Sequence, residues 1–158
     1  MIEIPLTNGG VARIDDADLH LVSLYRWRKY RNKRATYAQS GQSPALILMH
    51  RLILGAPKGV MVDHADRDGL NNTRENIRFC SNAENMMNIG KMSGSSKFKG
   101  VSWHTKVSKW RVTIRRDGCT TELGEFENEI AAAKQYDRAA RIFFGKFART
   151  NEMMGLLP

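Results

Sequence analysis

The sequence VDHADRDGLNNTREN, Val62 to Asn76, concentrates polar side chains between two apolar runs. It contains three aspartates, three asparagines, one glutamate and one histidine. The residues GVMV before the first aspartate are typical of a buried strand, and NIRFC at the far end predicts a second strand. Neighbouring side chains on a strand point to opposite faces, so Asp63 and His64 can perform different tasks at the end of the first strand.

A helix is predicted directly after the second strand. Ser81-Asn82-Ala83-Glu84 is a capping box, in which the serine side chain satisfies the backbone N–H of Glu84 while Glu84 reaches back. Asn85 then lies in the first turn of this helix. The local order is therefore strand, polar loop, strand, helix.

Two alternatives without catalysis are open for the polar stretch. A calcium-binding EF-hand loop has its positions 1, 3, 5, 6 and 12 occupied here by His64, Asp66, Asp68, Gly69 and Glu75. Against it, a histidine stands where the first aspartate belongs, and a strand precedes the loop in place of a helix. A surface hairpin with a turn at Asp68-Gly69 explains the turn residues, but not the acid–histidine pair at the end of a buried strand.

A third interpretation is the metal site of a nuclease. Phosphodiester hydrolysis needs an activated water, a cation for the charge on the phosphate and the leaving group, and rigid positioning. The segment HRLILGAPKGVMVDHADRDGLNNTRENIRFCSNAEN, His50 to Asn85, resembles the HNH endonuclease motif of homing endonucleases from mobile elements, with its internal spacing intact. The resemblance implies a ββα-metal nuclease module, to which further N-terminal strands are added.

The same resemblance implies a role for each polar residue. His64 would be the general base, Asp63 and Asn85 would bind one divalent cation, and Asn76 would hold the catalytic loop in shape. An aspartate together with an amide oxygen is a hard ligand set, which suits Mg²⁺ or Mn²⁺ better than Zn²⁺. Supporting roles fall to His50 and Arg51.

The charge of the chain points to a polyanionic partner. In 158 residues Lys and Arg number 25 against 16 Asp and Glu, for a net charge of +9 and a pI near 9.9. The start, MIEIPLTNGG, lacks the features of a signal peptide, and no apolar run is long enough to span a membrane, so a cytoplasmic protein is expected. Cys80 and Cys119 are solitary and are expected to be reduced thiols.

The basic residues fall into two segments with a linker between them. Arg26–Arg34 carries six positive residues and Lys97–Arg116 carries seven, and neither segment contains an acid. The intervening NIGKMSGSSKFK mixes Gly, Ser and Lys without periodicity, which is typical of a flexible linker. We therefore expect two domains, 1–93 and 94–158, with a boundary near Gly94. In the first, MIEIPL, VARID and ALILMH predict short strands, with a turn at Asn8-Gly9-Gly10.

The second domain shows one strand and one helix with clear periodicity. In KWRVTIRR the residues Trp110, Val112 and Ile114 alternate with Arg111, Thr113 and Arg115, which predicts one apolar and one basic face. A helix is predicted over Glu129–Phe144, stopped by Gly145. Its apolar stripe would consist of Ala132, Tyr136, Ala139, Ala140 and Phe143.

The segment Ser96–Asn151 resembles the plant ethylene-response-factor (APETALA-two) DNA-binding domain. The match is carried by KGV, WRVTIR, LGEF and AAAKQYDRAARIFFG. The resemblance implies a three-stranded antiparallel sheet in the major groove of double-stranded DNA, with the helix on its back. We expect the acidic residues Glu125, Glu127, Glu129 and Asp137 to lie away from the basic face. The candidate contacts, with lysines on phosphates and arginines able to read guanine, are Lys99, Trp103, Lys106, Lys109, Arg111, Thr113 and Arg115.

Taken together, the sequence predicts an α+β protein with a ββα-metal nuclease module followed by a three-stranded antiparallel sheet packed on one helix. The expected function is that of a homing-type, metal-dependent DNA endonuclease with one Mg²⁺ or Mn²⁺ ion per site. The alternatives are a DNA-binding regulator that has lost catalysis and, third, an RNA-binding module, which would need exposed stacking aromatic residues.

Overall fold

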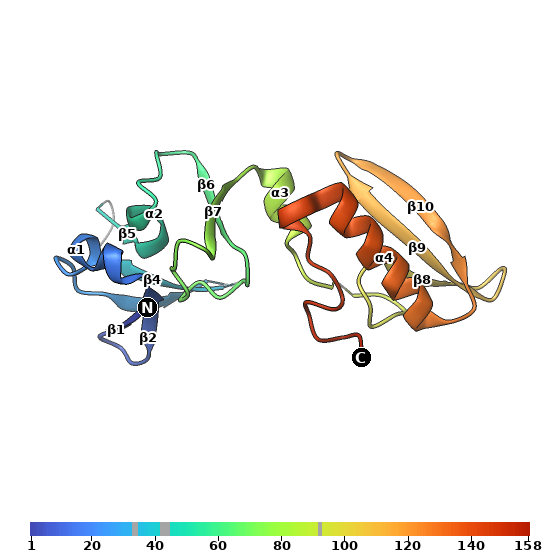
Figure 1. Ribbon diagram of the computed structural model, residues 1–158, viewed down its shortest axis with the longest axis horizontal. Helices are drawn as coiled ribbons and strands as arrows, with labels where there is room; N and C mark the ends of the chain where they lie inside the picture. The colour runs from blue at the N-terminus through green and yellow to red at the C-terminus, as the bar shows by residue number, and fades with distance from the viewer. Residues whose placement is uncertain (33–34, 42–44, 92) are drawn as a thin grey trace. The chain divides into compact units, whose positions relative to one another are not determined.

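The computed structural model describes residues 1–32, 35–41, 45–91 and 93–158. In this part of the chain small antiparallel sheets and helices combine into an α+β protein (Figure 1). The described residues form two compact units, Met1–Ser81 and Asn82–Pro158. This division precedes the predicted boundary near Gly94, because α3 (Asn82–Met87) contacts η2 (Gly145–Phe147). None of the described helices combines the length and the hydropathy needed to cross a membrane.

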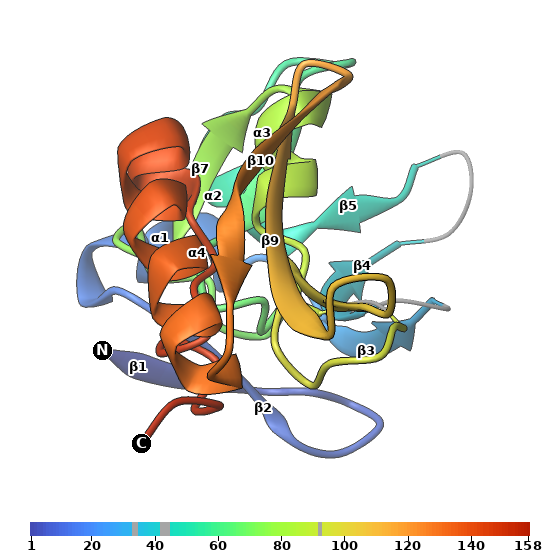
Figure 2. The same cartoon turned by 90° about the vertical axis from the view of Figure 1, so that its right-hand side faces the viewer.

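The first unit consists of hairpins joined by short helices. Its elements in chain order are β1 (Ile2–Pro5), β2 (Val11–Ile14), η1 (Asp16–Asp18), α1 (Leu19–Val22), β3 (Arg28–Arg31), β4 (Thr36–Ser40), β5 (Ile47–Leu48), α2 (Met49–Ile53), β6 (Met61–His64) and β7 (Ile77–Cys80). β1 pairs with β2 and β6 with β7, while a third sheet has the order β3-β4-β5, with β3 at its edge (Figure 2). The predicted turn after β1 is present, with positive φ angles at Gly9 and Gly10.

One prediction for the first unit was wrong, and two strands were missed. ALILMH is not one strand, because β5 ends at Leu48 and α2 begins at Met49. A short apolar run does not distinguish strand from helix by its pattern, and here Met49 and Ile53, one helical turn apart, both enter the core. The basic segment Arg26–Arg34 contains the unpredicted strand β3, and a second unpredicted strand, β4, follows it. Lys33 and Arg34 of that segment lie outside the described residues.

The polar loop between β6 and β7 is anchored to the rest of the first unit at both ends. Arg13 on β2 donates its backbone N–H to Leu70 at 2.8 Å and accepts from the backbone N–H of Asn72 at 2.7 Å. Further along, the Arg74 side chain lies 2.6 Å from the Oδ1 atom of Asp18, a carboxylate that is 1% exposed. Ile77, the first residue of β7, belongs to the same apolar core as Trp27 and Met49. These contacts fix the loop to the rest of the first unit.

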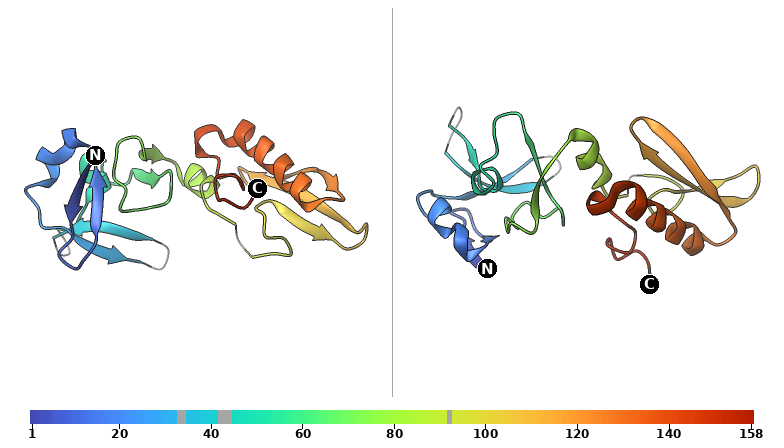
Figure 3. Two further views of the ribbon diagram at one scale, coloured as in Figure 1. Left: turned by 60° about the horizontal axis from the view of Figure 1, so that its bottom comes forward. Right: turned by 45° about the horizontal axis from the view of Figure 1, so that its top comes forward.

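The second unit is a three-stranded antiparallel sheet with a helix on one face (Figures 2 and 3). Besides α3 and η2, it contains β8 (Val101–His104), β9 (Lys109–Arg116), β10 (Cys119–Phe126) and α4 (Glu129–Phe144), with the strand order β10-β9-β8. Asn128 caps α4 by accepting from the backbone N–H of Ala131, and Gly145 ends it with a φ of 51°, so the predicted bounds are confirmed.

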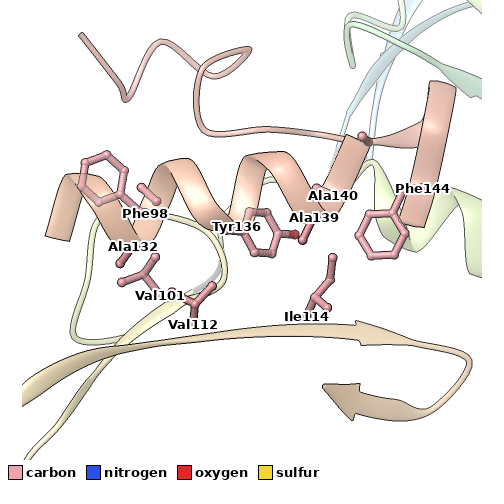
Figure 4. Close-up of a cluster of buried hydrophobic side chains, with 11 residues drawn as sticks. Phe98, Val101, Val112, Ile114, Ala132, Tyr136, Ala139, Ala140 and Phe144 are labelled. Atoms are coloured by element: carbon pink, nitrogen blue, oxygen red, sulfur yellow. The ribbon is translucent and has the colours of Figure 1, made fainter. Parts of the chain in front are cut away.

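The core of the second unit lies between α4 and the sheet (Figure 4). It contains Val112 and Ile114 from β9, as predicted, and Tyr136 from α4. The sheet approaches the helix closely at Gly100, where an added Cβ atom would lie 1.9 Å from Cδ2 of Tyr136 and where φ is +76°. Only glycine combines this conformation with this contact. The packing therefore explains the glycine of the KGV segment.

Two residues of α4 differ from the predictions. Phe143 is 39% exposed and Phe144 is buried, because Phe144 lies one turn after Ala140 on the buried stripe and Phe143 is rotated away from it. Asp137 is not part of an acidic surface, since it is 2% exposed. Its carboxylate accepts from the backbone N–H and the amide of Asn151, at 2.7 and 2.9 Å, and so ties the C-terminal segment to the helix.

Candidate active site and nucleic-acid interface

The β6–β7 hairpin places Asp63 and His64 beside each other in a buried position. The two residues are 7% and 5% exposed, and their cross-strand partners are Arg78 and Ile77. Nε and Nη2 of Arg78 donate to Oδ2 of Asp63 at 3.0 and 2.7 Å. This paired donation fixes the orientation of the carboxylate and balances its charge. Sequence reasoning missed Arg78, although the hairpin register alone would have placed it opposite Asp63.

Asn76 is the centre of a hydrogen-bond network that shapes the polar loop. Its Oδ1 atom accepts from the backbone N–H of Asp66 at 3.0 Å. Its Nδ2 atom donates to Oδ1 of Asp66 at 2.8 Å and to the carbonyl of Asn71 at 2.7 Å. Burial raises the pKa of Asp66, but hydrogen bonds from Asn71, Asp68 and Asn76 outweigh it and leave that pKa below its ordinary value.

The same network disfavours the calcium-loop alternative. Asp66 uses both carboxylate oxygens within the loop, because Oδ1 also accepts from the backbone N–H of Asp68 and Oδ2 accepts from Asn71. Asp68 is engaged in the same way, by the backbone N–H of Leu70 and by Arg13. A strand, β6, leads into the loop where an EF-hand has a helix.

His64 is oriented by Asn72, which is fully buried. Nε2 of His64 lies 3.3 Å from Oδ1 of Asn72. The amide of Asn72 cannot turn round without losing a partner, because its Nδ2 atom donates to the carbonyl of Leu70 at 3.1 Å. Its oxygen therefore faces the imidazole, which favours the neutral tautomer with the hydrogen on Nε2 and the basic lone pair on Nδ1.

The surroundings of His64 keep its ring neutral near pH 7. Burial lowers the pKa of His64 below its ordinary value, and the opposing effects of Asn72 and the nearby aspartates are smaller. A neutral imidazole is the form that can accept a proton. The geometry and the protonation state of His64 are thus both suited to a general base.

Two further rings pack against His64. His50 on α2 meets it edge to face at a centroid distance of 4.8 Å, and Tyr37 on β4 lies 5.4 Å from His50 and 5.8 Å from His64. Burial, followed by the nearby His64 and Arg51, lowers the pKa of His50 to about 3. Nδ1 of His50 is buried and has no hydrogen-bond partner among the described residues. No sequence signal connects Tyr37 to the motif.

Arg51 stabilises the segment that leads into β6. Its guanidinium donates to the carbonyls of Val60 and Pro57, both at 2.6 Å, and to that of Ala56 at 3.3 Å. Three carbonyls on one guanidinium hold the connection between α2 and β6 in one conformation. Arg51 therefore supports the hairpin through the backbone.

In the second unit, the candidate DNA contacts do not share one surface. Residues opposite one another on neighbouring strands share a face, so four of the seven candidates lie on the sheet face away from α4: Lys109, Arg111, Thr113 and Arg115. Lys106 lies in the adjoining turn and is exposed. Trp103 lies on the other face, where it packs edge to face on Trp110 at 4.9 Å. Lys99 donates its ammonium to the carbonyl of Met87 at 2.8 Å and so has a structural partner.

The free sheet face is also less basic than predicted. Glu125 lies directly opposite Arg111, and Glu122 lies opposite Thr113. Glu125 pairs with Nδ1 of His104 on the same face. The expectation that Glu125 lies apart from the basic residues was therefore wrong, because the bulge between Glu122 and Gly124 returns the glutamate to this face.

Known proteins are similar in sequence to the segment that carries Asp63 and His64. The family model "HNH endonuclease" matches residues 48–87. An uncharacterized HNH endonuclease of Acanthamoeba polyphaga mimivirus is 30% identical over 137 residues, which cover 84% of this chain and 70% of the viral protein. The chain belongs to the HNH endonuclease family. Protein 3.8 of Escherichia phage T7 is 33% identical over 94 residues, 59% of this chain and 77% of the phage protein.

The C-terminal part of this HNH endonuclease is similar to plant proteins of another kind. An AP2-like ethylene-responsive transcription factor of Arabidopsis thaliana is 38% identical over 66 residues, which are 42% of this chain and 14% of the plant protein. No solved structure matches the chain. The HNH match spans β5 to α3 and therefore includes residues of both compact units.

Two residues of the matched segment carry oxygen atoms of the kind that bind divalent cations. Asp63 offers a carboxylate that Arg78 holds in place, and Asn85, half-buried on α3 in the second unit, offers an amide oxygen. Both are hard oxygen ligands of the kind that Mg²⁺ and Mn²⁺ accept. In the part of the chain that the structure describes, no three His, Cys, Asp or Glu side chains form a cluster that could hold a metal ion.

Proposed function

We propose that the protein is a homing-type, metal-dependent endonuclease of double-stranded DNA from a mobile element. The nuclease module corresponds to residues 1–93, because the motif includes Asn85, and the DNA-binding module to residues 94–158. The observation that carries the proposal is the pair of His64 and Asn72, which presents a neutral, oriented imidazole next to an ordered carboxylate.

In this proposal His64 accepts a proton from water at Nδ1, while Nε2–H remains bonded to Asn72. The water oxygen attacks the phosphorus, and the bond from phosphorus to the 3′ oxygen breaks. The 3′ oxygen takes a proton from solvent water, which yields 5′-phosphate and 3′-hydroxyl ends. The oxygen of Asn72 then faces the N–H of a positively charged ring, a stronger hydrogen bond than that to the neutral ring. Asp63 and Asn85 would hold the cation, which when bound supplies positive charge for the leaving oxygen.

The second module would position the nuclease on its site. Lys109, Arg111, Thr113 and Arg115 form the group of candidates on the free face of the sheet, with Lys106 beside them. Lys99 and Trp103 are contact candidates from the sequence and would act from other positions than this face. The similarity to the plant transcription factor supports DNA as the partner of this module.

Incubation of the full chain with supercoiled plasmid tests the function directly. We expect conversion to nicked or linear DNA with Mg²⁺ or Mn²⁺, and no conversion in excess chelator, because the leaving oxygen then lacks its counter-charge. Equal cleavage with and without chelator would contradict metal dependence. Binding of the plasmid without cleavage under every metal condition would favour the inactive regulator.

A further inference from the structure

The sheet face that carries Tyr37 continues outward from the candidate active site. Directly opposite residues of an antiparallel pair lie on the same face, and the pairs here are Tyr30 with Tyr37 and Arg28 with Gln39. Tyr37 itself contacts the rings of His50 and His64. Arg28 and Tyr30 of the edge strand β3 are therefore on the active-site side of this sheet.

The other two residues of β3 point to the opposite face. Lys29 is paired with Ala38 and Arg31 with Thr36, out of phase with the tyrosines. The Lys29 side chain lies against Gly10 of the β1–β2 turn. β3 thus presents one arginine on the active-site side and one on the far side, on a strand whose four residues are all exposed.

A hollow of about 750 Å³ lies on the active-site side of the same sheet. Asn32 and Tyr37 line it from the β3–β4 hairpin, His50 and Arg51 line it from α2, and Lys58 lines it from the connection to β6. Its charged lining residues are basic, and the buried Nδ1 of His50 belongs to a residue of its wall. A phosphate-bearing chain fits this charge distribution better than any apolar ligand.

The guanidinium of Arg28 is oriented by the side chain of Gln39. With the amide of Gln39 turned so that its oxygen faces the guanidinium, it accepts from Nη2 of Arg28 at 2.9 Å and from Nε at 3.2 Å. Gln39 is 2% exposed, so its amide is fixed in place and orients the guanidinium. An arginine has five N–H donors, so donors remain for a ligand. Tyr30, next along this face, is 45% exposed and offers a ring to a sugar or a base.

We propose that this Arg28–Tyr30 face, the side of β3–β4 that carries Arg28, Tyr30, Tyr37 and Gln39, binds the DNA strand next to the scissile phosphate. Arg28 contacts a backbone phosphate and Tyr30 packs on the adjoining nucleotide. Cross-strand neighbours lie about 5 Å apart, so Tyr30 is within roughly three nucleotides of His64 at ~3.4 Å per nucleotide. The inference rests on the proposed function, since it names how the same active site holds its substrate.

β3 provides its own matched control, because Arg28→Gln and Arg31→Gln remove the same charge from the same strand on opposite faces. We would measure binding of the full chain to a duplex by fluorescence anisotropy, in chelator and over a range of salt concentrations. Arg28→Gln should weaken binding and reduce the slope of log K against log salt by about 0.9, the value for one phosphate contact. Arg31→Gln should leave the slope unchanged, and Arg28→Lys should restore it, since a phosphate contact needs the charge. Thermal unfolding of each variant checks that the Gln39 contact is not needed for folding.

A second measurement locates the DNA strand relative to the active site. A photoreactive phenylalanine analogue at the position of Tyr30 should crosslink to DNA within about three nucleotides of the cut, whereas the same analogue at Lys29 should not crosslink there. Equal slopes for Arg28→Gln and Arg31→Gln, or equal crosslinking from both positions, would overturn the inference even if cleavage proves metal-dependent. A reduced slope in Arg28→Gln alone would support it even if no metal allowed cleavage, so the two proposals fail separately.

Discussion

At the scale of single residues, the proposed role of His64 depends on the buried residue that contacts its ring, Asn72. A histidine that acts as a base needs the correct tautomer, and Asn72 selects it because Leu70 fixes the direction of the amide. The sequence motif predicts His64, but the importance of Asn72 only follows from its complete burial and its hydrogen bonds. In the proposed mechanism Asn72 is therefore a positioning residue, which acts through His64.

Replacement of Asn72 tests this tautomer preference. Asn72→Ala should lower the single-turnover cleavage rate by on the order of 10–100-fold, the range found when a hydrogen-bond partner that orients a metal-binding histidine is removed. Asn72→Asp retains an acceptor at the same position and should recover part of the rate. Nitrogen NMR of His64 should show hydrogen on Nε2 in the wild type and a mixture of tautomers in Asn72→Ala. An unchanged tautomer and rate in Asn72→Ala would contradict the role.

The lowered pKa of the buried His50 leads to a prediction about stability rather than catalysis. Its pKa is about 3 in the folded protein against 6.5 for an ordinary histidine, so the unfolded chain binds a proton first as the pH falls. The free energy of unfolding should therefore be highest above pH 6.5 and decline from there towards pH 3, by as much as about 4 kcal/mol. Urea unfolding at several pH values measures this. His50→Gln should flatten the decline, whereas replacement of the exposed His20 should not.

At the scale of elements, the sequence predicted best where one periodicity covers a whole segment. The alternation in β9 and the bounds of α4 were confirmed, because a packed sheet and a long helix impose their periods on many residues. Short elements were less predictable. β5 and α2 share one apolar run, and β3 lies in a segment that was interpreted only by its charge. Tyr37 could not be assigned to the site, because its ring contacts with His50 and His64 come from the tertiary fold and no motif marks them.

The close contact between the sheet and α4 gives a prediction with a matched control. Gly100→Ala and Gly118→Ala place a side chain at similar φ angles of +76° and +82°. Both should lose about 1–2 kcal/mol for the backbone conformation. Gly100→Ala should lose roughly 1–3 kcal/mol more, because Tyr136 occupies the space, whereas no atom lies within 4 Å of the Gly118 site. Thermal unfolding that ranks the two variants equally would show that Tyr136 moves aside freely.

At the scale of the whole molecule, we propose that cutting and positioning fall to different parts of one chain. The acid–histidine pair lies in the first unit, and the face with Arg111 and Arg115 lies in the second. If the two functions are separate, replacing both arginines with alanine should weaken site affinity by about 1–3 kcal/mol for each base that an arginine reads, without removing metal-dependent nicking of unrelated DNA. Gel shifts on the target site and nicking of unrelated plasmid measure the two effects, and full site preference in the double variant would contradict the separation.

The most direct test is a comparison of cleavage and binding by His64→Ala. General-base catalysis typically contributes 10²–10⁴-fold, so the variant should nick plasmid in Mg²⁺ slower by that factor. Its affinity for DNA in chelator should stay within about twofold of the wild type, because His64 is buried and offers no phosphate contact in the free protein. Cleavage by His64→Ala at the wild-type rate, with binding intact, would show that His64 is not the base and would contradict the proposed mechanism.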